Sequence, residues 1–161
     1  MRTHWPRRLA PLLGLVPLGC APEPAEDSGP APSLSIGQGA VAFTPLGEDS
    51  VEVVFGPQGG WHIEPAVRAW GLPVDGLVLS YDLLDAAGAS RVIAVEAKLS
   101  EDRVVPLAEG GWERVGDRLV LEVTSAEELV GERLTLSVRA APVGEAPVEV
   151  ALEVTLVDEV E

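Results

Sequence analysis

The sequence predicts an all-β domain over residues 33–161, built as an antiparallel two-sheet sandwich of about seven or eight strands. Apolar and polar residues alternate through most of this region, which is the pattern of a β-strand with one buried face. Short clusters rich in glycine and proline separate the alternating runs and indicate turns. No long run has a helical period, so crossover helices and a parallel sheet are disfavoured.

The two clearest strands are residues 133–140 and 148–156. In the first, Leu134, Leu136 and Val138 fall on one face and polar residues fall on the other. The last strand repeats this alternation, so we expect both strands to have one face in the core and one in solvent. The other predicted strands, in chain order, are residues 34–43, 51–55, 61–70, 77–84, 92–99 and 118–123.

One short helical signal interrupts the strands. Ser125 and Glu128 have the spacing of a capping box, Leu129 follows, and Gly131 is a stop signal. These residues predict a single helical turn between two strands. The order of strands and late helical turn resembles immunoglobulin-like sandwiches, although the Cys-Trp-Cys pattern of antibody domains is missing. A small barrel or a jelly roll is the alternative.

The first eight residues contain three arginines and no acid, and residues 9–19 are uncharged and mainly apolar. This is the order of a secretory signal peptide. The apolar run is shorter than the roughly 20 residues that a membrane-spanning helix needs, and Pro11 and Pro17 interrupt it. The amino terminus therefore predicts export and disfavours a transmembrane anchor.

Leu18, Gly19 and Cys20 end the apolar run, and Cys20 is the only cysteine of the chain. This ending resembles the lipobox of bacterial lipoproteins, although Pro17 and Leu18 stand where the family usually has leucine and a small residue. The resemblance implies cleavage between Gly19 and Cys20 and acylation of Cys20. A conventional signal peptide cut elsewhere, or twin-arginine export, is the alternative.

The predicted organisation has three parts: residues 1–19 as a signal peptide, residues 20–32 as the lipidated cysteine and a disordered tether, and residues 33–161 as the domain. The tether is rich in proline and acidic residues and has no large apolar side chain to bury. Ala21 is not the aspartate that retains typical lipoproteins at the inner membrane. The resemblance therefore implies an outer-membrane anchor, with the outer face of the inner membrane or secretion as alternatives.

Composition excludes several classes of protein. The chain has 11 Lys and Arg against 26 Asp and Glu, a formal net charge of −15, so nucleic acid is not an expected partner. A single cysteine cannot form an internal disulfide or a thiolate metal site. The sequence has no glycine-rich phosphate loop between a strand and a helix and no G-x-S-x-G motif. We therefore predict that the chain is not an enzyme and uses no cofactor.

Residues 56–62 read GPQGGWH, and Pro57 and the two glycines predict a hairpin turn. The string is similar to a turn in uncharacterised, lipobox-bearing bacterial proteins, a resemblance that implies no activity. Gln58, Trp61 and His62 are candidate binding residues, because an aromatic ring beside polar groups is a common binding anchor. The alternative is an ordinary turn without function.

Glu64 is the fourth candidate, because its spacing places it on the same strand face as His62. A metal site would need at least three ligands, so a solvated polar face is the simpler reading of this pair. The tryptophans Trp61, Trp70 and Trp112 are expected mainly to fill the core, with Trp70 or Trp112 partly exposed.

Our leading hypothesis is a lipid-anchored cell-envelope protein that acts as a non-catalytic binding or structural module, with another envelope protein or a glycan as partner. The alternative is a metal- or carbohydrate-binding protein, or an enzyme, that uses a site around Trp61, His62 and Glu64.

Overall fold

A computed structural model describes residues 31–57 and 59–158. The predicted signal peptide, the cleavage site at Gly19 and Cys20, most of the tether and Gln58 lie outside the described residues. In the described part of the chain, none of the helices has the length and apolar character needed to cross a membrane.

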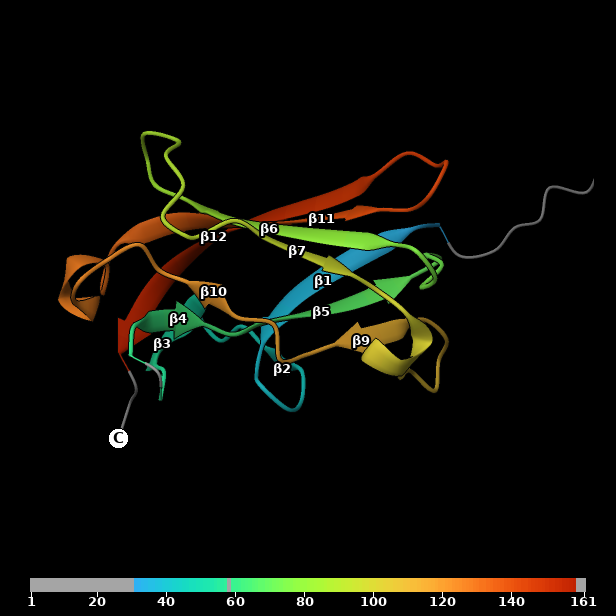
Figure 1. Cartoon of the computed structure of the whole chain (residues 1–161), viewed down its shortest axis with the longest axis horizontal. Helices are drawn as coiled ribbons and strands as arrows, with labels where there is room; N and C mark the ends of the chain where they lie inside the picture. Colours follow the sequence, from blue (N-terminus) through green and yellow to red (C-terminus); the bar gives the residue numbers. More distant parts are fainter. Residues whose placement is uncertain (1–30, 58, 159–161) are drawn as a thin grey trace, which may run out of the picture.

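The described residues form two packed sheets, so the predicted all-β sandwich is confirmed. The five-stranded sheet has the order β2-β1-β5-β9-β8, and the seven-stranded sheet has the order β10-β4-β3-β12-β11-β6-β7 (Figure 1). The strands are β1 Ser33–Gln38, β2 Thr44–Pro45, β3 Ser50–Phe55, β4 Trp61–Ile63, β5 Pro65–Trp70, β6 Val78–Leu84, β7 Val95–Lys98, β8 Val105–Pro106, β9 Trp112–Arg114, β10 Leu119–Val120, β11 Arg133–Ala141 and β12 Val148–Asp158. Two single-turn 3-10 helices are η1 Glu101–Arg103 and η2 Ala126–Glu128.

Strands β11 and β12 have the inward and outward faces that their alternation predicts. Leu134, Leu136 and Val138 are buried on β11, and Val154 and Leu156 are buried on β12. The two strands pair antiparallel in register, with Leu136 opposite Leu152. Each fully buried aliphatic side chain contributes about 1.5–3 kcal/mol through removal of apolar surface from water. The buried residues of β11 and β12 therefore contribute a large part of the stability of the core.

The expected single strand over residues 61–70 is wrong, because the chain changes sheets at Glu64. β4 pairs with β3 and β10 in the seven-stranded sheet, whereas β5 pairs with β1 and β9 in the five-stranded sheet. Pro65 follows the switch and has no N–H to donate to a ladder. The backbone oxygen of Glu64 instead accepts a hydrogen bond from Gly39 at 2.8 Å.

Twelve strands occur among the described residues instead of the seven or eight expected. Part of the excess comes from division of long runs, and part from β8 and β9, which are too short to show alternation. One pair also departs from the antiparallel expectation. β12 runs parallel to β3, with Thr155 opposite Ser50 and Asp158 opposite Val53.

Residues 91–93 join the two sides of the seven-stranded sheet. The N–H of Ile93 donates to the oxygen of Val120 at 3.0 Å, and the N–H of Glu122 donates to the oxygen of Arg91 at 3.0 Å. The N–H of Arg91 donates in turn to Leu83 of β6 at 2.8 Å. This segment therefore bridges β10, at one edge of the seven-stranded sheet, to β6 near the other edge.

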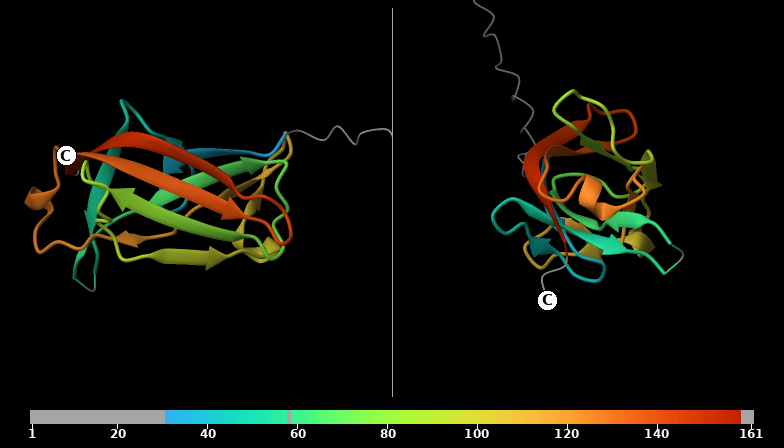
Figure 2. Two further views of the ribbon diagram at one scale, coloured as in Figure 1. Left: turned by 90° about the horizontal axis from the view of Figure 1, so that it is seen from above. Right: turned by 90° about the vertical axis from the view of Figure 1, so that its left-hand side faces the viewer.

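The two ends of the molecule carry different features. Figure 1 shows that β1 begins at one end of the long axis, while the hairpin between β3 and β4 lies at the other end. The view from above in Figure 2 shows the same separation. The chain therefore enters the domain at the end opposite the GPQGGWH turn.

The predicted capping box is confirmed at η2. The Ser125 side chain accepts a backbone hydrogen bond from Glu127 at 3.4 Å, and the Glu128 carboxylate accepts from the N–H of Ser125 at 3.0 Å. Leu129 follows and is fully buried. η2 thus places an apolar side chain in the core beside the turn.

Replacing Ser125 with alanine is expected to lower the free energy of unfolding by about 1 kcal/mol, because a cap that satisfies a helix N–H is lost. Urea denaturation followed by tryptophan fluorescence measures this change. Ser137→Ala, on a strand face, is the control and should have a smaller effect. Equal effects of the two substitutions would contradict a capping role.

Candidate functional site

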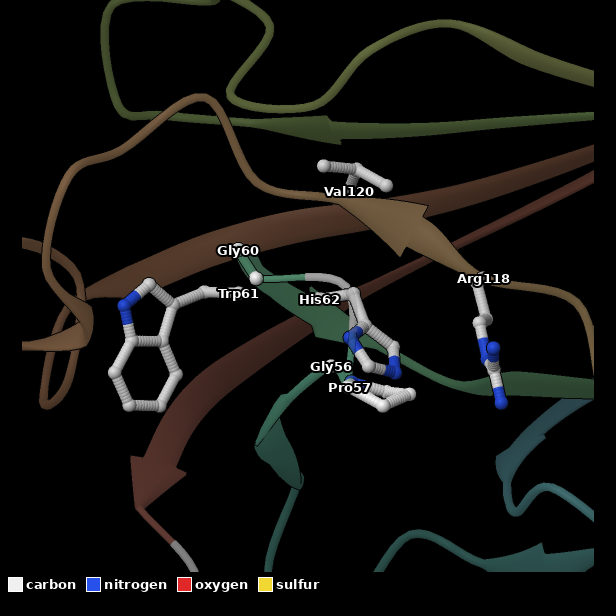
Figure 3. Close-up of a pocket in the computed structure, with 8 residues that line it drawn as sticks. Gly56, Pro57, Gly60, Trp61, His62, Arg118 and Val120 are labelled. Atoms are coloured by element: carbon white, nitrogen blue, oxygen red, sulfur yellow. The ribbon is translucent and has the colours of Figure 1, made fainter.

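A cleft of about 190 Å³ lies against β4 and β10, beside the hairpin that joins β3 to β4 (Figure 3). The β3–β4 hairpin, whose residues form part of its lining, is at the end of the molecule opposite the start of β1 (Figure 1). Its lining combines a glycine-rich turn with a buried imidazole, a guanidinium group and two apolar side chains. The lining residues are Gly56, Pro57, Gly59, Gly60, Trp61, His62, Arg118 and Val120.

The hairpin geometry explains why glycines form one wall of the cleft. Gly59 and Gly60 have φ angles of +81° and +98°, a region that residues with a Cβ rarely adopt. The N–H of Gly56 donates to the oxygen of Gly60 at 2.9 Å, which closes the turn. The His62 ring packs over the backbone of Gly56, where a Cβ would lie at the ordinary contact distance of 3.4 Å.

Two polar side chains, His62 and Arg118, line the cleft, and Glu64 lies beside it and contacts both. His62 is only 6% exposed, and its Nε2 lies 3.5 Å from Oε1 of Glu64. The same Oε1 accepts a hydrogen bond from Nε of Arg118 at 3.2 Å. Nε2 of His62 is buried and makes no hydrogen bond with any described residue. A buried polar atom without a partner carries a desolvation cost, so this nitrogen is the unusual feature of the site.

The structure brings some of the candidate residues together and separates others. The side chains of His62 and Glu64 lie 3.5 Å apart, although Glu64 follows the end of β4 and is not part of that strand. The ring of Trp61 points away from the imidazole (Figure 3) and packs edge-on against Phe55, with 4.9 Å between ring centroids. The described part of the chain therefore offers an imidazole–carboxylate–guanidinium group rather than an aromatic platform.

Arg118 was missed by the sequence reasoning. It is 54 residues from Glu64 in the chain, and only the pairing of β10 with β4 brings the two together. Acidic and basic residues beside strand-like runs are common in a sequence. The sequence alone therefore did not indicate that Glu64 and Arg118 would form an ion pair.

Among the described residues, no group of three or more His, Cys, Asp or Glu side chains is placed to hold a metal ion. The Glu64 carboxylate is already paired with a cation, because Nε of Arg118 lies 3.2 Å from its Oε1.

The expectation that Trp112 could be partly exposed is wrong. Trp112 is 3% exposed, and its indole N–H donates to the oxygen of Leu72 at 3.0 Å. Its position on β9 turns the ring inward, opposite to Glu113. On the outer face, Glu113 pairs with Arg68 at 2.9 Å, and the Arg68 guanidinium lies 4.3 Å from the centre of the Phe43 ring.

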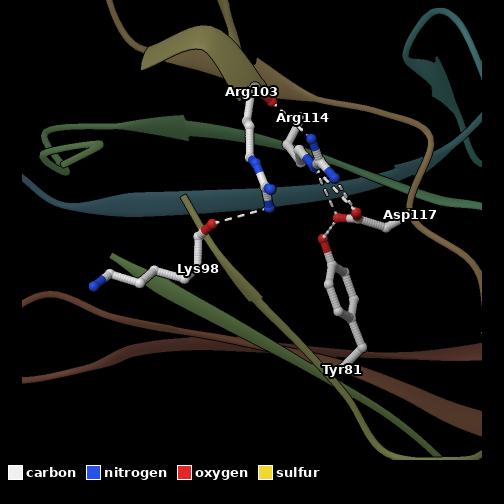
Figure 4. Close-up of polar contacts among 5 residues, drawn as sticks. All are labelled: Tyr81, Lys98, Arg103, Arg114 and Asp117. Carbon is white, nitrogen blue, oxygen red and sulfur yellow. Dashed lines mark hydrogen bonds and ion pairs between the residues drawn. The ribbon is translucent and has the colours of Figure 1, made fainter. Parts of the chain in front are cut away.

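A second polar cluster lies inside the sandwich and was also missed from the sequence (Figure 4). The hydroxyl of Tyr81 donates to Asp117 at 2.7 Å, and Arg114 forms an ion pair with the same carboxylate. Arg114 also donates to the backbone oxygen of Arg103 at 2.9 Å. Tyr81 and Asp117 are both buried. The cluster has no unpartnered polar atom, and its role is to join β6, β9 and the segment before β10.

Burial and the neighbouring Asp117 carboxylate raise the pKa of Tyr81 well above its usual value of 10.0. Because Tyr81 is the only tyrosine, the tyrosinate absorbance of the chain reports this residue alone. We expect ionisation near pH 10 in denaturant and only at distinctly higher pH in the folded chain.

The same shift has a consequence for stability. The folded state holds the Tyr81 proton more tightly, so its contribution is complete below pH 10.0 and falls as the pH rises towards the folded pKa. Above pH 10, the free energy of unfolding of Tyr81→Phe should fall less steeply with pH than that of the original chain. Coincident titration curves for the folded and unfolded chain would contradict the buried contact with Asp117.

The fold defines an all-β sandwich protein, and a small cleft lies beside its β3–β4 hairpin. No protein-family model matches the chain. No curated protein matches it significantly either.

Proposed function

We propose that the chain is a lipid-anchored protein of the bacterial cell envelope that serves as a non-catalytic binding module. The lipobox-like ending at Cys20 and the proline-rich tether support the anchor. In this proposal the protein is anchored in the outer membrane by the acyl chains on Cys20. Two or more acyl chains bind a bilayer firmly, whereas a single chain binds only marginally.

The single observation that carries the binding role is the position of the cleft. The chain enters the sandwich at the start of β1, whereas the β3–β4 hairpin, which lines the cleft, lies at the opposite end (Figure 1). A tether attached at the first end presents the second end away from the lipid. His62, whose buried Nε2 makes no hydrogen bond with any described residue, lines the cleft at that presented end.

The charge of the chain supports a role away from the membrane surface. The net charge of −15 is repelled by anionic lipid headgroups and by nucleic acid. The tether and the lipid would then hold the domain near the membrane without adsorption of the domain itself.

The mass of the mature amino-terminal peptide tests the anchor. The protein is expressed in a lipoprotein-competent host, and the membrane fraction is compared between the original chain and Cys20→Ala. We expect an acylated peptide beginning at Cys20 in the first and loss of membrane association in the second. An unmodified terminus at another residue would show that the signal peptide is of a different kind.

The second candidate is a metal-binding or enzymatic role for the site around Trp61, His62 and Glu64. The 3.5 Å approach of His62 to Glu64 favours it. Calorimetric titration with Zn²⁺ and Ca²⁺, with His62→Ala as the matched variant, separates the two candidates. Heat that disappears in His62→Ala would support this second role.

A further inference from the structure

We propose that the open edge of β12, over residues 148–154, binds an extended segment of a partner protein in which apolar and basic residues alternate. The segment would add a strand beside β12, which is a common mode of peptide recognition. This edge shares no residue with the lining of the cleft at His62. The inference therefore goes beyond the proposed function and needs neither the cleft nor the anchor.

The first observation is that this part of β12 is paired on one side only. Residues 148–155 pair with β11, but β3 pairs with β12 only from Thr155 to Asp158. β1 of the five-stranded sheet lies beside β12 (Figure 2), and the two strands do not pair. Unpaired N–H and C=O groups along a strand edge are a template for a further strand. Residues 148–154 are such an edge, although β12 lies in the interior of the strand order.

The direction of the backbone identifies the groups that this edge presents. The N–H of Thr155 donates to the oxygen of Asp49 at 2.8 Å, on the side away from β11. Successive residues of a strand direct their backbone groups to opposite sides, and each residue of an antiparallel pair uses its N–H and its C=O on the same side. Glu149, Ala151 and Glu153 therefore direct both groups to the open edge. All three residues are exposed, so the backbone of a partner can reach them.

The inward side chains of β12 show that the core is less well covered at this edge. Three of them are apolar and only partly buried, namely Val148, Val150 and Leu152. Their direct partners on β11 are fully buried, namely Ala140, Val138 and Leu136. An added strand with apolar residues at alternate positions would cover the exposed part of the β12 side chains. Removal of this apolar surface from water would favour binding.

Charge selects a basic partner. The charged side chains of this edge are Glu149 and Glu153, which lie opposite Arg139 and Arg133 of β11. Arg133 is 3.9 Å from Glu153, and both side chains are more than three-quarters exposed. On the open side, β1 (Ser33–Gln38) has no charged residue. Lysine or arginine at the outward positions of an added strand would lie beside the two carboxylates, and opposite charges directly across a strand pair are stabilising.

A second copy of this chain fits the edge less well. Two copies related by a two-fold axis would pair their β12 edges antiparallel. The register that uses Glu149, Ala151 and Glu153 of both copies places Glu149 opposite Glu153 at both ends, and like charges directly opposite are destabilising. The proline-rich residues 21–32 have no large apolar side chain to cover the inward residues. A basic segment of another protein therefore matches the edge better than either part of this chain.

The test uses the full chain with Cys20→Ala, so that no lipid anchor forms. The probe is a nonapeptide of alternating lysine and valine with blocked ends, and its counterpart has glutamate in place of lysine. Backbone amide NMR spectra are recorded during titration with each peptide. We expect saturable shifts at residues 148–154 and in β1 with the lysine peptide only. Hydrogen exchange of the Glu149, Ala151 and Glu153 amides should slow in the same complex.

Two edge variants test the charge and the backbone contact separately. Glu149→Lys with Glu153→Lys should weaken binding of the lysine peptide about tenfold, because two attractive cross-strand pairs become repulsive. Glu101→Lys with Glu109→Lys makes the same change of net charge at exposed positions elsewhere and should have a much smaller effect.

Ala151→Pro removes one N–H from the open edge and none from the ladder with β11. Proline is tolerated at an edge where its missing N–H would face solvent. We expect this variant to bind the lysine peptide about fivefold more weakly, the loss typical of one hydrogen bond. The charge variants keep the test decisive if Ala151→Pro does not fold.

Three results would overturn the proposal. Absence of saturable shifts with the lysine peptide would show that the edge does not accept a further strand. Equal binding of the two peptides, or an equal loss in the Glu101 and Glu109 control, would show that the edge carboxylates do not select the partner. Shifts at residues 148–154 that depend on protein concentration without peptide would show that a second copy occupies the edge. The acylation of Cys20 is tested separately and is unaffected by any of these results.

Discussion

Replacement of Asp117 by alanine is expected to lower the free energy of unfolding by about 3 kcal/mol. The substitution removes the carboxylate that accepts from both Tyr81 and Arg114 inside the sandwich. Breaking a buried ion pair by removal of one partner costs about 3–5 kcal/mol, because the other charge stays buried without compensation. The Arg114 side chain is 18% exposed, so water reaches part of the stranded charge and the lower end of that range applies.

The measurement is denaturant unfolding of Asp117→Ala, Tyr81→Phe and the double variant. Tyr81→Phe removes one hydrogen bond and should cost about 1 kcal/mol. The double variant should cost less than the sum of the two, since both substitutions remove the same contact. Asp102→Ala, an exposed carboxylate in η1, is the control for general loss of negative charge. Additive effects in the cycle would show that Tyr81 and Asp117 do not interact in solution.

The fold could be predicted where alternation is long and one face is wet. β11 and β12 satisfy both conditions, and the alternation correctly predicts that Leu134, Leu136 and Val138 of β11 are buried. β8 and β9 could not be predicted, because two or three residues cannot show a period. Their place in the five-stranded sheet comes from pairing of Val67 with Arg114 across a long interval of chain, which a single sequence does not reveal.

The site could be predicted only as far as one strand extends. The spacing of His62 and Glu64 places them on one face, and the structure confirms that their side chains approach within 3.5 Å. The spacing does not predict that the chain enters the other sheet at Pro65. It also does not predict that β10 places Arg118 beside Glu64. The buried Tyr81 cluster was hidden for a related reason. Arg114 lies on a strand of three residues, where an inward-facing arginine has no sequence signature.

The turn before β9 provides a sharp comparison between two adjacent glycines. Gly110 and Gly111 have φ angles of +88° and +83°, so alanine at either position occupies an unfavourable region of backbone conformation. That cost is about 1–2 kcal/mol for an L-residue. The surroundings differ, because a Cβ on Gly110 meets open space, whereas a Cβ on Gly111 would overlap the backbone oxygen of Ala69.

Gly111→Ala is therefore expected to lower the free energy of unfolding by about 2–5 kcal/mol, the conformational cost plus the roughly 1–3 kcal/mol of an added group in a packed site. Gly110→Ala should lower the free energy of unfolding only by the conformational cost of about 1–2 kcal/mol. Thermal and urea unfolding of both variants measure the difference. Ala69 lies on β5 and pairs with Trp112, so the clash moves β9 away from the sheet and weakens the packing of that buried indole. Equal stability of the two variants would mean that the turn is not fitted against β5 as the structure shows.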